Sequence, residues 1–141
     1  MKKNPVSIIV PIYNVEKYIE RCIRSLFEQT MDDVEYIFVD DCTPDQSMAI
    51  LRHLMEEYEF RNLNIKIISH EHNKGLPSAR NTGLAAATGD YIFHCDSDDW
   101  MEKDAMEKMY QAAQANQADI VWCDWFLSFR SNERYMQQKG V

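Results

Sequence analysis

Acidic side chains gather where short apolar segments of this chain end. Asp40 and Asp41 follow the apolar segment 34–39, and Asp96, Asp98 and Asp99 follow the segment 90–95. Clustered carboxylates repel one another and have raised pKa values unless a cation lies among them. Mg²⁺ and Mn²⁺ prefer oxygen ligands and often share a carboxylate pair with substrate phosphates. If the backbone stays extended there, Asp96 and Asp98 point to the same side, which predicts a Mn²⁺ or Mg²⁺ site that binds a diphosphate.

Other residues near these carboxylates suit a nucleotide. Tyr13 offers a flat ring on which a base can stack. Asp41 can accept a hydrogen bond from a base N–H, which favours uracil or guanine over adenine. Arg80 can bind phosphate in bidentate fashion, and the helices expected after Asn14 and Pro77 add positive partial charge at their N-termini.

The hydrophobic pattern predicts the elements that position these residues. Strand-like runs alternate with helical stripes, so we expect an α/β fold with a mainly parallel sheet between helices, a three-layer sandwich. Parallel strands share one carboxyl edge, and open sheets of this kind bind ligands there. The expected strands are 6–10 (stopped by Pro11), 34–39, 63–68, 90–95 and 119–126, and the expected helices are 15–27, 43–58, 77–87 and 104–116. Asn14 is the expected N-cap of the first helix, and Thr43, Pro44 and Gln46 form an expected capping box for the second.

Four motifs, in order, resemble glycosyltransferase family 2 with the GT-A fold over residues 5 to about 125. They are Ser7-Ile-Ile-Val-Pro-Ile-Tyr-Asn14, Val39-Asp-Asp-Cys-Thr-Pro-Asp45, Asn73-Lys-Gly with Ala79-Arg-Asn-Thr-Gly83, and Gly89-Asp-Tyr-Ile-Phe-His-Cys-Asp-Ser-Asp-Asp99. The resemblance implies that Pro11, Tyr13 and Asp41 contact a nucleoside and that Asp96 and Asp98 form the DxD motif of the family. Cys42-Thr43-Pro44 departs from the Gly-Ser-Thr that is usual there. The predicted substrate-binding set is Pro11, Tyr13, Asn14, Asp40, Asp41, Arg80, Asp96 and Ser97.

The resemblance implies that a sugar is transferred from a nucleoside diphosphate to an acceptor hydroxyl with inversion at the anomeric carbon. The expected nucleotide is UDP, and the expected acceptor is a sugar or a lipid-linked molecule. Polysaccharide biosynthesis is one process that uses such a reaction. Such a reaction needs a general base for the acceptor, and in this family it lies well downstream of the DxD motif. Glu133 is the one acidic residue after Asp124, and we do not assign the base to it. We therefore expect residues 1–127 to be the nucleotide-sugar-binding part, residues 128–141 to be a tail or the start of an acceptor-binding region, and the base to lie beyond residue 141.

Simpler explanations exist for each site residue. Asp98 and Asp99 can cap a turn, and Asp40 and Asp41 can cap a helix. Tyr13 can pack under its loop, and Arg80 can be a solvated helix residue. His70 and His72 are interpreted as strand-end and loop residues rather than metal ligands, and His94 as a hydrogen-bonded core group.

Composition excludes other classes of protein. The 141 residues have a net charge of −8 and no basic run, which argues against a nucleic-acid partner. No signal peptide or transmembrane segment is apparent, so the expected location is the cytoplasm, including the inner face of the membrane. The four cysteines lack a CxxC pair and are expected to be reduced core thiols. The glycines form neither a dinucleotide fingerprint nor a P-loop.

Two alternatives remain beside the transferase hypothesis. A haloacid-dehalogenase-like phosphatase also uses Asp-x-Asp, but after its first strand and followed by Thr or Val, whereas Trp100 follows Asp99 here. A non-catalytic nucleotide-binding or assembly module is the more serious alternative. The segment 120–129 is apolar on both faces, with Trp122 and Phe126 on one and Trp125 and Phe129 on the other, which predicts a homo-oligomer formed through this strand.

Overall fold

A computed structural model of the chain describes residues 4–121, 123, 125–129 and 132–136. The chain divides into two compact units, residues 1–107 and residues 108–141. The strands of the first unit are β1 (Val6–Ile12), β2 (Val34–Asp40), β3 (Asn64–Ser69) and β4 (Tyr91–His94). Its helices are α1 (Ile19–Phe27), α2 (Ser47–Glu57), the 3-10 turn η1 (Glu59–Arg61) and α3 (Leu76–Ala86), while α4 (Ala105–Ala115) crosses the boundary between the units.

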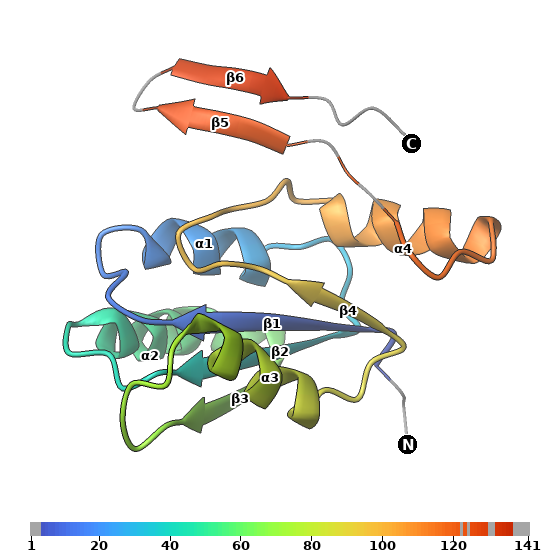
Figure 1. Cartoon of the computed structure of the whole chain (residues 1–141). Helices are drawn as coiled ribbons and strands as arrows, with labels where there is room; N and C mark the ends of the chain where they lie inside the picture. Colours follow the sequence, from blue (N-terminus) through green and yellow to red (C-terminus); the bar gives the residue numbers. More distant parts are fainter. Residues whose placement is uncertain (1–3, 122, 124, 130–131, 137–141) are drawn as a thin grey trace. The chain divides into compact units, whose positions relative to one another are not determined.

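The four strands form one parallel sheet in the order β3-β2-β1-β4. Their arrows point the same way in Figure 1, so their carboxyl ends share one edge. This confirms the predicted α/β class and the four strands of the first unit. The central strand β1 is buried along its whole length, as expected for a strand covered on both faces.

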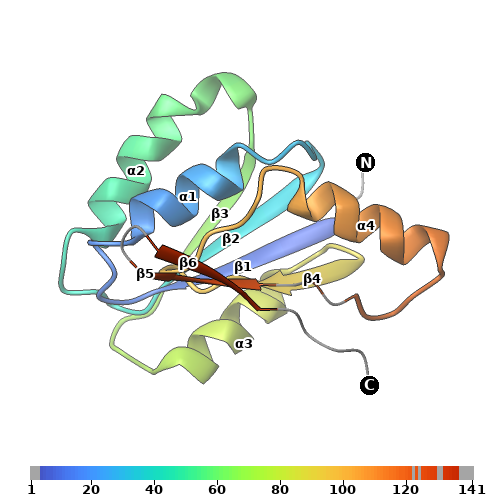
Figure 2. The ribbon, with the colours of Figure 1, turned by 90° about the horizontal axis from the view of Figure 1, so that it is seen from above.

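Helices cover both faces of this sheet, which confirms the predicted layers. Phe27 of α1 packs edge-to-face on Tyr36 and Phe38 of β2. Ile37 and Val39, which point to the opposite face of β2, pack around Ala79 of α3. Figure 2 shows α1 and α2 on one side of the sheet and α3 on the other.

The close approach of α3 to β1 depends on Gly83. A Cβ atom at this position would overlap the side chain of Ile9. Glycine therefore brings the helix near enough to the sheet for its N-terminus to reach the carboxyl edge.

Pro11 does not end β1, contrary to the sequence-based prediction. β1 continues to Ile12, and Pro11 is aligned with Val39 of β2. The Ile12 carbonyl accepts a bond on the β2 side and the Ile9 carbonyl accepts one on the β4 side, so backbone groups of Pro11 face β4. The last residue pair between β1 and β4 is Ile9 with His94. Proline is tolerated at position 11 because no β1–β4 hydrogen bond is required past that pair.

The predicted helix starts are also wrong. Asn14 does not cap α1, because its φ of 57° is left-handed, and the helix begins at Ile19. The predicted capping box of α2 does not form either, since Gln46 precedes the first helical residue, Ser47. Side-chain contacts between the two loops instead hold the segments that precede both helices, and Asp45 accepts the amide of the first α2 residue, Ser47.

Cys42 occupies a backbone conformation that favours glycine. Its φ is 59°, and a left-handed conformation costs an L-residue about 1–2 kcal/mol. We expect Cys42→Gly to increase the free energy of unfolding by about 1 kcal/mol, since the unfolded-state entropy of glycine offsets part of the gain. Urea unfolding of both proteins measures this. A lower stability for the glycine variant would show that the Cys42 side chain contributes more than its strained backbone costs.

The second unit contains an antiparallel hairpin of β5 (Trp125–Phe129) and β6 (Asn132–Met136). The predicted strand at 119–126 is therefore displaced toward the C-terminus, and β6 forms within residues 128–141, the segment expected to be a tail or the start of an acceptor-binding region. Trp122 lies outside the described residues. Self-association through the apolar segment stays a prediction.

Several smaller predictions are corrected as well. His94 is exposed rather than in the core, because β4 is an edge strand of the described sheet. The four cysteines are free, but only Cys22 and Cys95 are buried. Among the described helices, none is long and apolar enough to cross a membrane.

Candidate active site

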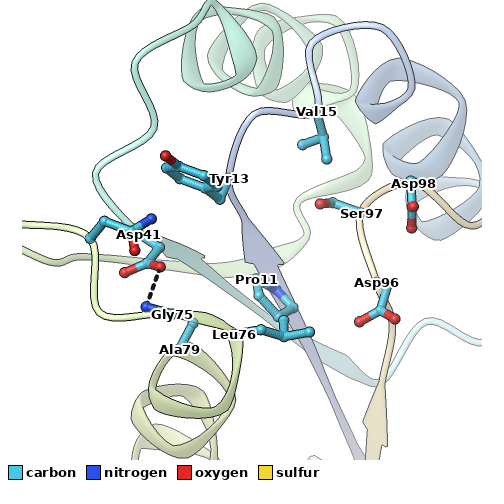
Figure 3. Close-up of a pocket in the computed structure, with 11 residues that line it drawn as sticks. Pro11, Tyr13, Val15, Asp41, Gly75, Leu76, Ala79, Asp96, Ser97 and Asp98 are labelled. Carbon is cyan, nitrogen blue, oxygen red and sulfur yellow. Dashed lines mark hydrogen bonds between the residues drawn. The ribbon is translucent and has the colours of Figure 1, made fainter.

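An open cavity of about 390 Å³ lies at the carboxyl edge of the sheet. Figure 3 shows Tyr13 and Asp41 on one side, Ser97 and Asp98 on the other, and Pro11 between them. The full lining is Pro11, Tyr13, Val15, Asp41, Asn73, Gly75, Leu76, Ala79, Asp96, Ser97 and Asp98. Parallel strands thus place residues from four segments around one space, as the sequence predicted.

The loop that carries Tyr13 is held by side chains from the segment after β2. Three consecutive backbone amides donate to that segment: Asn14 to Thr43 Oγ1 (2.8 Å), Val15 to Ser47 Oγ (3.2 Å) and Glu16 to Asp45 Oδ2 (3.0 Å). Burial opposes the charge of Asp45, but donors from Ser47, Thr43 and Glu16 outweigh it and lower the Asp45 pKa to about 2. Tyr13 itself is 46% exposed, so its ring is available to a ligand.

Asp41 is a buried carboxylate at the end of β2. Its Oδ1 accepts from the Lys74 amide (2.8 Å) and lies 2.8 Å from His70 Nδ1, and its Oδ2 accepts from the Gly75 amide (2.9 Å). Burial alone would raise the Asp41 pKa, but these donors outweigh it and lower the pKa. Asp41 therefore remains ionised and also anchors the turn at residues 73–75, where Gly75 has a φ of 92°.

Asp96, Asp98 and Asp99 bring oxygens within 4.8 Å of one another. The reason differs from the predicted one, because the backbone turns: the Asp99 amide donates to the Asp96 carbonyl (3.0 Å). Burial and, to a smaller extent, the charges of Asp98 and Asp96 raise the Asp99 pKa, and the part due to charge is the repulsion expected of such a cluster. Three hard oxygen donors at this spacing fit a divalent cation, and Asp99 lies beside the two predicted ligands.

The segment after this turn is tied to α1. The Arg21 guanidinium lies 4.0 Å from the centre of the Trp100 ring. Gln29, which is buried, donates to the Glu102 carbonyl (2.7 Å) and accepts from the Met106 amide (3.1 Å). These contacts fix where the acidic turn leaves the sheet.

Three predicted site residues lie outside the cavity lining. Arg80 forms an ion pair with Asp96 (2.8 Å). In this structure its guanidinium therefore binds a carboxylate and not the phosphate that was its predicted partner. Asp40 accepts the Thr43 amide (3.0 Å), which stabilises the loop after β2 rather than capping a helix, since α2 begins at Ser47. Asn14 contributes its backbone amide to Thr43.

The sequence-based interpretation missed other residues. Asn73 and Gly75 line the cavity, and their presence in the third motif was the available signal. His70 was taken for an ordinary strand-end residue, yet its ring is buried against Asp41. No spacing rule links positions that are 29 residues apart.

Comparison with known proteins decides the family. Residues 7–141 match the family model of Glycosyl transferase family 2. The chain belongs to glycosyltransferase family 2. It is 45% identical over 131 residues to the uncharacterized glycosyltransferase EpsJ of Bacillus subtilis, covering 93% of this chain and 37% of that protein.

Two solved glycosyltransferase structures are similar to this chain. TarS of S. aureus, in complex with UDP, is 35% identical with a TM-score of 0.71 over 79% of this chain and 32% of its own. The mannosyltransferase PcManGT from Pyrobaculum calidifontis, in complex with GDP-Man and Mn²⁺, is 26% identical with a TM-score of 0.71 over 80% of this chain and 33% of its own. These GT-A neighbours confirm the predicted fold class. The chain spans about a third of the length of these relatives.

Proposed function

We propose that this cavity binds the nucleoside diphosphate sugar of an inverting glycosyltransferase, with uridine diphosphate as the nucleotide. The observation that carries the proposal is the placement of an aromatic and carboxylate pair, Tyr13 and Asp41, across one cavity from the acidic turn 96–99. A base and a diphosphate are the two ends of one ligand. Each end thus has a matching set of groups.

The base end favours a nucleobase that has an N–H group within its ring, as uracil does at N3 and guanine at N1. The ionised Asp41 carboxylate can only accept hydrogen bonds, and the exposed Tyr13 ring provides a stacking surface beside it. Uracil and guanine carry such an N–H, and the TarS and PcManGT neighbours hold UDP and GDP-Man. The N-terminus of α3 begins at Leu76 and lines the same cavity, adding partial positive charge.

The diphosphate end relies on a divalent cation, Mn²⁺ or Mg²⁺, held by Asp96 and Asp98 with Asp99 beside them. When bound, such an ion stabilises the leaving diphosphate as a Lewis acid. Ser97 lies between the two ligands and lines the cavity. Arg80 neutralises part of the charge on Asp96, and we propose that it reaches the phosphates when the nucleotide binds.

Inversion requires a base that takes the proton of the acceptor hydroxyl on the face opposite the leaving group. Each carboxylate that lines the cavity already has another role: Asp41 accepts bonds from its donors, Asp96 pairs with Arg80, and Asp98 is the second proposed metal ligand. We therefore assign the base to a segment outside residues 1–141. The acceptor, a sugar or a lipid-linked sugar, would contact that segment as well.

Calorimetric titration of the chain with UDP, with and without Mn²⁺, tests the proposal. We expect binding of UDP that requires the metal and weaker binding of ADP, because adenine presents no ring N–H to Asp41. GDP serves as the comparison for a second base with such a group. Binding of ADP as tight as that of UDP would contradict the role of Asp41, and no binding of any nucleotide in the presence of metal would contradict the donor site.

A further inference from the structure

His70 joins three elements of the fold beneath the base end of the cavity. It directly follows β3, its Nδ1 lies 2.8 Å from Asp41 Oδ1 after β2, and its Nε2 lies 2.8 Å from Thr82 Oγ1 in α3. The side chains of His70 and Asp41 are only 6% and 3% exposed. A buried imidazole with both nitrogens bonded is held in one orientation.

The direction of these bonds follows from the carboxylate. Because ionised Asp41 can only accept, the proton must be on His70 Nδ1. Asp41 Oδ1 then accepts hydrogen bonds from His70 Nδ1 and the Lys74 amide, while Oδ2 accepts one from the Gly75 amide. A carboxylate has about four acceptor sites. The described residues therefore fill Oδ1 and leave one acceptor site on Oδ2.

We infer that His70 is a positioning residue that sets the base preference of the enzyme through Asp41. This inference rests on the proposed nucleotide site. By occupying Oδ1, His70 prevents the carboxylate from turning and keeps the free acceptor of Oδ2 for the ligand. A fixed acceptor matches the ring N–H of uracil and opposes cytosine, whose corresponding ring nitrogen is itself an acceptor. Sites built around one hydrogen bond discriminate strongly against analogues that lack it.

Two substitutions separate positioning from mere packing. The Asn amide nitrogen can take the place of His Nδ1, whereas the Gln amide nitrogen lies near the place of Nε2. His70→Asn should therefore retain the donor to Asp41, and His70→Gln should keep the contact with Thr82 but lose that donor. Thr82→Val removes the hydroxyl that orients the ring while it preserves the shape of the side chain.

The measurement is the ratio of the dissociation constants of CDP and UDP, determined by calorimetry in Mn²⁺ for each variant. We expect wild type to prefer UDP. His70→Gln should reduce this ratio about tenfold, because it loses a hydrogen bond to a charged group. His70→Asn should keep the ratio within about threefold of wild type. Thr82→Val should reduce the ratio by a smaller factor. His53→Gln, an exposed histidine on α2, is the matched control and should not change it.

The outcomes separate this inference from the proposed function. If wild type binds UDP and His70→Gln keeps the same ratio, or weakens UDP and CDP equally, the positioning role is wrong and the donor site stands. If wild type binds no nucleotide, the donor site is wrong and the inference falls with it. Should His70→Gln not fold, an unchanged ratio in Thr82→Val overturns the inference. Nitrogen NMR of the His70 ring gives a check without ligand, because a proton on Nε2 alone would contradict the assigned donor.

Discussion

Replacing Asp98 with asparagine is expected to weaken UDP binding in Mn²⁺ by about a hundredfold or more, since losing even an indirect partner of a metal costs 10–100-fold in affinity. Asparagine has the same shape, but it offers one neutral oxygen in a cluster whose oxygens lie within 4.8 Å of one another. The measurement is calorimetric titration with UDP at saturating Mn²⁺.

Titration without metal makes this test specific. The acidic turn repels a diphosphate when no cation is bound, so removing one negative charge should leave metal-free UDP binding unchanged or slightly tighter. Asp119→Asn, an equal change of charge at an exposed position, is the control and should behave as wild type. An equal loss with and without Mn²⁺ would mean that Asp98 is not a metal ligand.

Glu35 is expected to be the most important single carboxylate for stability. Its residue is 1% exposed. Oε1 accepts from the Ser7 hydroxyl (3.0 Å) and the Thr88 amide (2.9 Å), and Oε2 accepts from the Thr88 hydroxyl (2.6 Å) and Lys66 (3.2 Å). These contacts join β1, β2 and β3 to the connection between α3 and β4. They therefore fix the start of the strand that leads to the acidic turn.

Glu35→Gln should lower the free energy of unfolding by about 3 kcal/mol, the scale of losing a hydrogen bond to a charged group and leaving a buried donor unsatisfied. The amide NH₂ has no suitable place. At Oε1 it would face the Thr88 backbone N–H, and at Oε2 it would face the Lys66 ammonium. Urea unfolding at pH 7 measures the loss, and Glu56→Gln on the exposed face of α2 should change stability by less than about 0.5 kcal/mol.

The pH dependence of this difference provides a further check. Burial alone would raise the Glu35 pKa, but donors from Thr88, Ser7 and Lys66 outweigh it and lower the pKa. A carboxyl with a lowered pKa in the folded state contributes stability above its unfolded pKa and loses that contribution as the pH falls through the folded pKa. The stability gap between wild type and Glu35→Gln should therefore narrow on acidification. A gap that widens would exclude an ionised Glu35 in the native protein.

The sequence was sufficient for the layers of the fold because hydrophobic periodicity reports burial directly. The four strands and the helices α1, α2 and α3 of the first unit lie where they were predicted, apart from boundaries, whereas the 3-10 turn η1 was not predicted. The boundaries failed at Asn14 and Thr43 because their partners come from another loop, 29 residues away for this pair. The prediction that His94 lies in the core was wrong for a related reason. The order of strands in the sheet decides which strand lies at an edge, and that order depends on contacts between distant segments.

In the site, too, the features that follow from strand positions were predicted, and those that depend on contacts between distant segments were not. Tyr13, Asp41, Asp96 and Asp98 line the cavity, since each follows a strand and parallel strands end together. The pairing of Arg80 with Asp96 and of His70 with Asp41 depends on side-chain directions across different elements. The turn at Asp96 likewise depends on a single backbone hydrogen bond that no residue pattern specifies.

Pro11 leaves β1 without a backbone donor beside the cavity that it lines. In the described sheet, the last residue pair between β1 and β4 is Ile9 with His94. The next β1 residue whose backbone groups face β4 is Pro11, which has no N–H to donate. The β1–β4 hydrogen-bond ladder therefore ends at the cavity, and the segment after β4 can turn at Asp96–Asp99 instead of continuing along β1.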